Sequence, residues 1–216
     1  MAYRAVLFDL DGTLLDTLKD LADCCNRVLR DRGMSQHPLE AYRHFIGDGR
    51  EALVRRILPA DRRDPATVAQ AVSSMDDDYS LHWADATRPY PGIPDLLKAL
   101  TERGVAMAVI SNKPDEFTRQ AVSQLLAEFR FSAVVGARPA VPNKPDPAAA
   151  LEIARGLGVK PSEVLFLGDT DIDMKTARAA GMRPVGALWG FRDAAELLAG
   201  GADALLRTPT DLLKML

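Results

Sequence analysis

Three short apolar runs along the chain each end at a group of polar residues. Residues 5–8 lead into Asp9, residues 105–110 into Ser111, and residues 164–167 into Gly168 and Asp169. An apolar run without polar alternation is typical of a strand buried on both faces of a parallel sheet. Because helical spacing follows these strands, the pattern predicts βαβ units and an open parallel α/β sheet. Further strands are expected over 131–136, 183–188 and 202–206, and further helices over 93–103, 115–128, 147–157, 170–180 and 209–216.

A long stretch between the first two strands contains helical spacing only. Helices are expected there from Leu18 to before Gly33, and over 38–46, 52–57 and 65–83. The run from Arg88 to Gly92, which holds two prolines and a glycine, is typical of a hinge. We therefore expect a helical unit over residues 16–87, inserted into a sheet unit made of residues 1–15 and 88–216. Both units have ordinary domain sizes.

The charge balance excludes several classes of protein. The 216 residues include 27 basic and 30 acidic side chains, a formal net charge of −3. This balance argues against a nucleic-acid-binding module, whose surface is basic. No apolar stretch approaches the roughly 20 residues of a membrane span, and the first ten residues lack the features of a signal peptide. We expect no nucleic-acid or membrane partner, and a monomer or weak homodimer.

The two cysteines, Cys24 and Cys25, are adjacent. Neighbouring cysteines do not readily bridge each other and lack the spacing of metal ligands. They fit helix packing in a reducing compartment, so a cytoplasmic location is expected.

Acidic residues follow the first and third of the apolar runs. Asp9 and Asp11 are two apart, so on a continuing strand they would face the same way, one as nucleophile or metal ligand and the other as acid or base. A polar strand end beside a turn is the alternative. Asp169 and Asp173 could join Asp9 in an oxygen site for Mg²⁺, or they could simply cap a helix. Because the carboxyl ends of parallel strands share one edge, these carboxylates are expected in one crevice.

Positive and neutral polar groups are available for the same edge. Lys144 stands in the run Pro142-Asn143-Lys144-Pro145 and could neutralise the carboxylates and a bound phosphate. A solvated surface lysine is the alternative. Ser111 and Asn112 could hold phosphoryl oxygens at a strand end, or they could form a turn or a helix cap.

Four segments in this order resemble the haloacid dehalogenase superfamily of phosphohydrolases, and within it the phosphoglycolate phosphatase group. They are Asp9–Asp16 with the sequence DLDGTLLD, Ser111-Asn112, Lys144-Pro145, and Gly168-Asp169 with Asp173. The resemblance covers nearly the whole chain. It implies a Rossmann-like core with an inserted helical cap that closes over the substrate.

The resemblance also implies a role for each matched residue. Asp9 would attack phosphorus and form an aspartyl-phosphate, and Asp11 would protonate the leaving oxygen. Mg²⁺ would be held by Asp9, the backbone carbonyl of Asp11 and Asp169, with Asp173 supporting the metal site. Ser111 and Asn112 would orient the phosphoryl group, and Lys144 would tie it to Asp9. A metal and a lysine would offset the repulsion between a carboxylate and a phosphate dianion.

The expected cap contributes further candidates. A break at Gly47-Asp48-Gly49 could present backbone amides at Gly47 and the Arg50 side chain to the mouth of the site. The alternative is a helix–helix turn with a solvated arginine, which has the same sequence pattern. Arg43 and His44 are further cap candidates, but core or surface roles fit them better. The run Trp189-Gly190-Phe191 could line the rim of the crevice, and a packing role fits it equally well. The acidic run 76–78 fits a solvated helix face better than a metal site.

These observations lead us to expect a Mg²⁺-dependent phosphomonoester hydrolase that acts on a small phosphorylated metabolite, with 2-phosphoglycolate as the first candidate. A sugar phosphate, a nucleotide or pyrophosphate remain alternative substrates. Dehalogenation is disfavoured because dehalogenases lack the second aspartate, here Asp11. A sugar phosphomutase is disfavoured because Leu21 stands where such enzymes usually carry a histidine. A non-catalytic binding protein is disfavoured because unused buried charges cost stability.

Overall fold

A six-stranded parallel sheet forms the centre of the molecule in a computed structural model that describes residues 3–216. Residues 1 and 2, which the sequence prediction placed in the sheet unit, lie outside the described residues. The strand order is β5-β4-β1-β6-β7-β8, and all neighbouring strands pair in parallel. The strands are β1 (Ala5–Phe8), β4 (Ala106–Pro114), β5 (Ala133–Ala137), β6 (Val164–Gly168), β7 (Arg183–Ala187) and β8 (Ala204–Leu206). The predicted parallel α/β sheet is confirmed.

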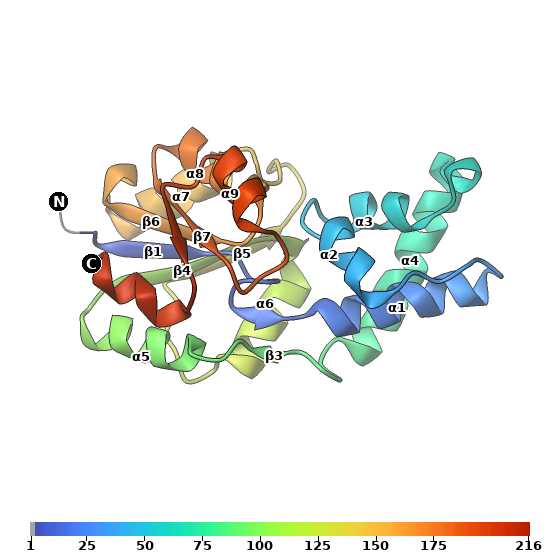
Figure 1. Ribbon diagram of the computed structural model, residues 1–216, viewed down its shortest axis with the longest axis horizontal. Coiled ribbons are helices and arrows are strands. Elements are labelled where there is room, and N and C mark those ends of the chain that lie inside the picture. The colour runs from blue at the N-terminus through green and yellow to red at the C-terminus, as the bar shows by residue number, and fades with distance from the viewer. Residues whose placement is uncertain (1–2) are drawn as a thin grey trace.

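Helices cover both faces of this sheet, as Figure 1 shows. Side chains of β1 alternate between two apolar clusters: Ala5 and Leu7 pack with α7 and α8, whereas Val6 and Phe8 pack with α5 and α6. This alternation is the two-residue period of a strand buried on both faces. The helices are α5 (Ile93–Glu102), α6 (Asp115–Leu125), α7 (Ala148–Leu157), α8 (Asp171–Ala180) and α9 (Ala194–Gly200).

Two of the predicted helices, over 38–46 and 209–216, differ from the expectation in length or in helix type. The chain end forms a 3₁₀ helix, η4 (Pro209–Lys214), which a Thr208–Asp211 capping box begins, and six residues leave little room for α-helical hydrogen bonds. The segment predicted as one helix over 38–46 is a 3₁₀ turn, η1 (Leu39–Ala41), followed by the single turn α2 (Tyr42–Phe45). In this segment only Tyr42 and Ile46 are buried, which is enough apolar contact for one turn.

The helical segment between the first two long strands lies beyond the carboxyl ends of the sheet (Figure 1). Its remaining elements are α1 (Leu18–Asp31), α3 (Arg50–Ile57), η2 (Ala60–Arg62) and α4 (Pro65–His82). The chain enters it at β2 (Leu15–Asp16) and leaves it at β3 (Arg88–Pro89), and these two short strands pair with each other. The buried Asp20 carboxylate accepts hydrogen bonds from the backbone of Ala86 and from Thr87, which ties α1 to the returning chain.

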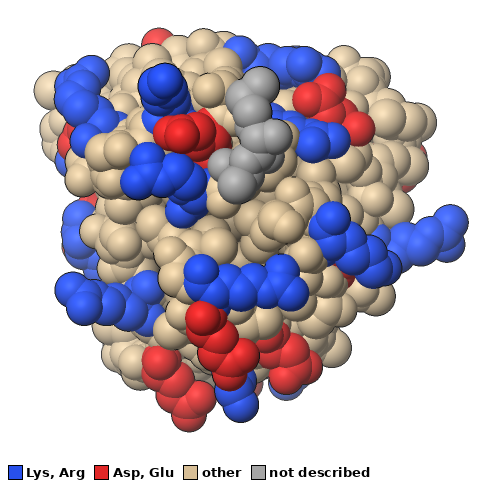
Figure 2. Space-filling view, turned by 90° about the vertical axis from the view of Figure 1, so that its left-hand side faces the viewer, with Lys and Arg blue, Asp and Glu red and all other residues tan. Residues whose placement is uncertain are grey.

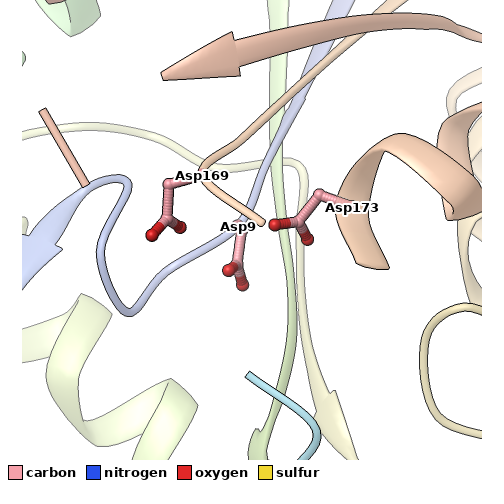
Figure 3. A group of neighbouring side chains, drawn as sticks. All are labelled: Asp9, Asp169 and Asp173. Atoms are coloured by element: carbon pink, nitrogen blue, oxygen red, sulfur yellow. The ribbon is translucent and has the colours of Figure 1, made fainter. Parts of the chain in front are cut away.

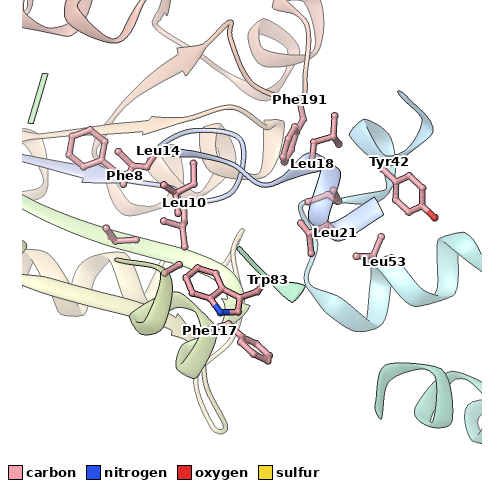
Figure 4. Close-up of a cluster of buried hydrophobic side chains, with 14 of the residues drawn as sticks. Phe8, Leu10, Leu14, Leu18, Leu21, Tyr42, Leu53, Trp83, Phe117 and Phe191 are labelled. Atoms are coloured by element: carbon pink, nitrogen blue, oxygen red, sulfur yellow. The ribbon is translucent and has the colours of Figure 1, made fainter. Parts of the chain in front are cut away.

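A single apolar cluster runs from the sheet into this helical segment. Figure 4 shows Phe8 and Leu14 of the sheet side in line with Leu18, Leu21 and Leu53 of the helices. Cys24 and Cys25 belong to the same cluster as buried free thiols, so the predicted packing role is confirmed. The opposite end of the molecule carries basic side chains interspersed with acidic ones (Figure 2). Within the described residues, no helix combines the length and the apolar character that crossing a membrane requires.

Candidate active site

Three buried carboxylates meet at the carboxyl ends of the central strands. Asp9 follows β1, Asp169 follows β6, and Asp173 lies in the first turn of α8 (Figure 3). One oxygen of each lies within 4.8 Å of an oxygen of the other two. Asp9 is 7% exposed, and Asp169 and Asp173 are fully buried. The sequence expectation that these three residues converge is therefore correct in geometry.

Two features of the backbone bring Asp9 and Asp169 together. The Asp9 N–H donates to the Leu167 carbonyl at 2.9 Å, which fixes the end of β1 against the end of β6. Two glycines leave space for the Asp169 side chain. A Cβ on Gly12 would lie 2.2 Å from an Asp169 oxygen, and one on Gly190 would lie 2.2 Å from the Asp169 Cβ. Gly12 also has φ +87°, a conformation that favours glycine.

Lys144 lies between two of the carboxylates. Its Nζ is 2.8 Å from Asp9 Oδ1 and 2.7 Å from Asp173 Oδ1, and it also donates to the Ile110 carbonyl at 3.3 Å. Burial alone would lower the pKa of this lysine, but the carboxylates of Asp173 and Asp9 outweigh that effect and raise it. Lys144 is therefore a buried, charged ammonium, and the alternative of a solvated surface lysine is wrong.

The carboxylates carry more negative charge than their surroundings neutralise. Burial, followed by the charge of Asp173, raises the pKa of Asp169 to about 7, and the same two causes raise the pKa of Asp9 well above its ordinary value. Hydrogen bonds to Asp169 from the Thr13 hydroxyl and the Phe191 N–H, both 2.8 Å, only partly offset this. The protein thus holds three carboxylates together, with Lys144 against two of them, at a cost in stability.

A divalent cation fits this donor set. All three groups offer hard carboxylate oxygens within 4.8 Å of one another, which are the ligands that Mg²⁺ prefers. Both oxygens of Asp173 already have protein partners. Oδ1 is paired with Lys144, and Oδ2 accepts hydrogen bonds from the Thr170 backbone N–H and hydroxyl in a capping box. Asp173 therefore both takes part in the cap of α8, as one alternative predicted, and lies in the carboxylate cluster. Among the described residues, an acidic cluster that could hold a metal ion exists here.

The raised pKa of Asp169 predicts how the metal-free protein responds to pH. Between about pH 4 and 7 the folded state binds more protons than the unfolded state, so stability falls as pH rises through this window. Asp169→Asn removes the ionisation, and we expect it to stabilise the metal-free protein at pH 8 by up to about 4 kcal/mol. Thermal melting in EDTA measures this, with Asp171→Asn on the exposed start of α8 as control. A less stable Asp169→Asn protein at pH 8 would contradict the expectation.

Asp11 points to a different partner, which the sequence analysis missed. Lys113 Nζ lies 3.1 and 3.3 Å from the two Asp11 oxygens and donates to the Tyr79 hydroxyl at 2.7 Å. Burial would lower the pKa of Lys113, but Asp11 and Tyr79 raise it. The sequence held one signal for Lys113: it follows Ser111 by two residues, the spacing that would place both side chains on one face of a continuing strand. Tyr79 gave no such signal, since its spacing from Met75 and Ala71 reads as helix packing.

Asn112 performs a task other than the predicted one. Its side-chain oxygen accepts from the Lys144 N–H at 2.9 Å, and its amide donates to the carbonyls of Lys144 and Gly47 at 3.0 and 3.1 Å. The side chain therefore positions the Lys144 loop and holds the helical segment against the sheet. Gly47 takes part through its carbonyl, whereas the sequence analysis had expected it to offer backbone amides.

Two arginines add to this junction between the helices and the sheet. Arg192 donates to the Ile46 carbonyl at 2.9 Å, and Arg43 donates to the Gly190 carbonyl at 2.8 Å. The loop at 189–191 packs beside the site: the Phe191 N–H donates to Asp169, and the Trp189 indole donates to the Thr13 carbonyl. His44 lies in a neighbouring polar hollow, away from the carboxylates.

A cavity connects the carboxylates to the helical segment. Asp9, Asp11, Ser111 and Lys113 line it from the sheet, and Arg50 lines it from the helical segment. Apolar side chains make up most of the remaining wall, namely those of Leu21, Ile46, Leu53, Met75 and Phe117. Arg50 forms an ion pair with Asp76, with 2.5 Å between Nη1 and Oδ2, and Arg27 forms one with Asp78. The acidic run 76–78 therefore supplies ion-pair partners for arginines of the helical segment.

Comparison with known proteins places this geometry in a family. Residues 6–187 match the model of the haloacid dehalogenase-like hydrolases. The chain is 33% identical over 213 residues to a phosphoglycolate phosphatase of Aquifex aeolicus, which covers 99% of this chain and 96% of the relative. It is 40% identical over 192 residues to a phosphoglycolate phosphatase of Pseudomonas putida, which covers 87% of this chain and 70% of the relative.

Solved structures agree with this assignment. A crystal structure of a predicted phosphoglycolate phosphatase from Haemophilus somnus superposes with a TM-score of 0.88 at 27% identity, covering 99% of this chain and 97% of that one. The predicted resemblance and fold are confirmed: the chain belongs to the haloacid dehalogenase-like hydrolases.

Proposed function

We propose that the protein is a Mg²⁺-dependent phosphomonoester hydrolase of a small metabolite, with 2-phosphoglycolate as the first candidate substrate. The observation that carries this proposal is the buried cluster of Asp9, Asp169 and Asp173 around Lys144 at the sheet edge. The names of the relatives from Aquifex aeolicus and Pseudomonas putida support the choice of substrate.

In the proposed reaction Asp9 is the nucleophile. An Asp9 carboxylate oxygen forms a bond to phosphorus while the bond from phosphorus to the leaving oxygen breaks, and Asp11 gives its proton to that oxygen. Water then attacks the aspartyl-phosphate, Asp11 takes a proton from the water, and Asp9 is released with inorganic phosphate. Lys144 holds Asp9 in place and offsets the negative charge of the phosphate dianion.

The metal would be held by Asp9, the backbone carbonyl of Asp11 and Asp169, with Asp173 supporting them. When bound, Mg²⁺ supplies the positive charge that stabilises negative charge on the phosphoryl oxygens. Ser111 lies on the cavity wall beside Asp9, where its hydroxyl would donate to a phosphoryl oxygen. Asn112 would contribute by fixing the loop that carries Lys144.

The helical unit over residues 16–87 would act as a cap that moves on the paired strands β2 and β3, with residues 1–15 and 88–216 as the core. Its closure would exclude water from the aspartyl-phosphate step. The cap side of the cavity also argues against a sugar phosphomutase, because Leu21 lines the wall and offers no acid or base. The free thiols of Cys24 and Cys25 support the proposal of a cytoplasmic location.

A panel of phosphorylated metabolites tests the proposal. The purified protein with Mg²⁺ is assayed for phosphate release from 2-phosphoglycolate, sugar phosphates, nucleotides and pyrophosphate, and the substrates are ranked by kcat/KM. We expect 2-phosphoglycolate near the top and no turnover in EDTA. A low rank for 2-phosphoglycolate would remove the substrate assignment, and absence of turnover on every substrate would remove the phosphatase assignment.

Arg50 is proposed to contact the distal group of the substrate. It faces the cavity but is paired with Asp76, so a substrate carboxylate would compete with Asp76 for the guanidinium. We expect Arg50→Ala to lower kcat/KM for 2-phosphoglycolate about tenfold while leaving 4-nitrophenyl phosphate, which lacks a carboxylate, within about twofold. Arg55→Ala, which removes a surface pair on the same helix, is the control. Equal losses on both substrates would exclude the specificity role.

A further inference from the structure

Asp11 depends on a lysine for its position. Its side chain is 12% exposed, and Lys113 holds both of its oxygens, at 3.1 and 3.3 Å. Among the described residues, no other side-chain hydrogen bond is made to the Asp11 carboxylate. A carboxylate that must first give and then take a proton needs a fixed distance to the leaving oxygen, because proton transfer is efficient only at hydrogen-bond range.

Lys113 in turn depends on the helical segment. Its Nζ donates to the Tyr79 hydroxyl at 2.7 Å and lies 4.5 Å from the centre of the Tyr79 ring. Tyr79 lies on α4 and Lys113 on β4, so this contact joins the helical segment to the sheet. The Tyr79 ring packs edge-on against the ring of Phe117 on α6, with 5.3 Å between the ring centres. The contact exists only while Tyr79 of α4 lies at the carboxyl end of β4.

We propose that Lys113 is a positioning residue for Asp11, and that Tyr79 completes this arrangement when the helical segment closes. The proposal rests on the assignment of Asp11 as acid and base. Without the Tyr79 hydroxyl, Lys113 loses a partner and can swing away from Asp11, so the proton donor is in place only over a closed site. Premature activation of water in an open site would thereby be avoided.

Two aryl phosphates test this proposal independently of the natural substrate. Phenyl phosphate and 4-nitrophenyl phosphate have similar shapes, but nitrophenolate leaves readily without a proton and phenolate does not. A variant that misplaces Asp11 therefore loses more activity on phenyl phosphate. A variant that only loosens the fold loses equally on both. The value to compare is kcat/KM, which covers the steps through departure of the leaving group.

We expect Lys113→Met to lower kcat/KM about 100-fold on phenyl phosphate and about tenfold on 4-nitrophenyl phosphate, within the range of general acid catalysis. Tyr79→Phe keeps the ring and removes only the hydroxyl, and we expect it to change the ratio of the two values about threefold. In the Lys113→Met background, Tyr79→Phe should have no further effect on this ratio. Tyr42→Phe, which removes a hydroxyl bonded to Asn26 elsewhere in the helical segment, is the matched control.

The possible results separate the role of Lys113 and its link to Tyr79 from the proposed phosphatase function. Equal losses on both substrates for Lys113→Met, or no loss, would overturn the positioning role. An undiminished effect of Tyr79→Phe in the Lys113→Met background would overturn the link through Tyr79. If Lys113→Met does not fold, as judged by thermal melting, Tyr79→Phe alone decides by its change in ratio. A wild-type protein that releases phosphate with Mg²⁺ from neither aryl phosphate nor any metabolite of the substrate panel would instead overturn the proposed phosphatase function.

Discussion

Replacing Asp9 by asparagine is expected to abolish phosphate release, with a loss in kcat of about 10⁴-fold or more. An amide is a far poorer nucleophile than a carboxylate and cannot form an acyl-phosphate. The change hardly alters volume, and it removes one of three mutually repelling carboxylates. Since burial and the charge of Asp173 raise the pKa of Asp9, we expect the metal-free variant to melt no lower than the wild type.

Initial rates on 2-phosphoglycolate and 4-nitrophenyl phosphate with saturating Mg²⁺ measure this effect. Asp16→Asn is the matched control, because Asp16 belongs to β2 at the junction with the helical segment. Activity of Asp9→Asn within tenfold of wild type on either substrate would contradict the role of Asp9. So would a control that is equally inactive.

Replacing Lys144 by methionine should cause the second large effect, on both activity and stability. The ammonium forms ion pairs with the Asp9 and Asp173 carboxylates and donates to the Ile110 carbonyl, in a site where its side chain is 3% exposed. Methionine preserves the length but leaves the carboxylates without a counter-charge. Breaking a buried ion pair in this way costs about 3–5 kcal/mol. We expect kcat/KM to fall about 10³-fold, because Asp9 and the phosphate then repel each other without compensation.

Adding Mg²⁺ separates the two effects of Lys144→Met. A bound cation replaces part of the missing charge, so the melting temperature of the variant should rise more with Mg²⁺ than that of the wild type, while activity stays low. Lys175→Met removes a lysine from an exposed ion pair with Asp171 on α8 and should change stability by less than about 1 kcal/mol. Recovery of full activity in Mg²⁺ would show that Lys144 acts on stability alone.

The sheet and the acidic cluster were predictable because short-range rules determine them. Apolar runs without alternation give parallel strands, and parallel strands place the residues at their carboxyl ends side by side. The sequence pattern alone therefore predicted that Asp9, Asp169 and Asp173 lie in one crevice. It also predicted the boundaries of α1, α4 and α8 to within a few residues.

The remainder depends on how the helical segment packs, which no local pattern specifies. Tyr79 has the spacing of a core residue and becomes part of the site only because its hydroxyl reaches Lys113 near the end of β4. Asn112 was expected to face a phosphoryl group, but the approach of Gly47 and the Lys144 backbone uses its amide. The short turn at 39–45 was overestimated as one helix, because apolar spacing does not reveal where a helix lacks a partner to pack against.

The central claim is that Asp9 becomes phosphorylated, and mass spectrometry of the Asp11→Asn variant tests it most directly. Without the base that activates water, the variant should form the aspartyl-phosphate and release it slowly. The variant is mixed with 4-nitrophenyl phosphate and Mg²⁺, quenched in acid and digested. We expect the added mass of one phosphoryl group on the peptide that contains Asp9, and no such mass in the Asp9→Asn, Asp11→Asn double variant. A phosphoryl group on another residue, or release of nitrophenol with no phosphorylated peptide at any time, would contradict it.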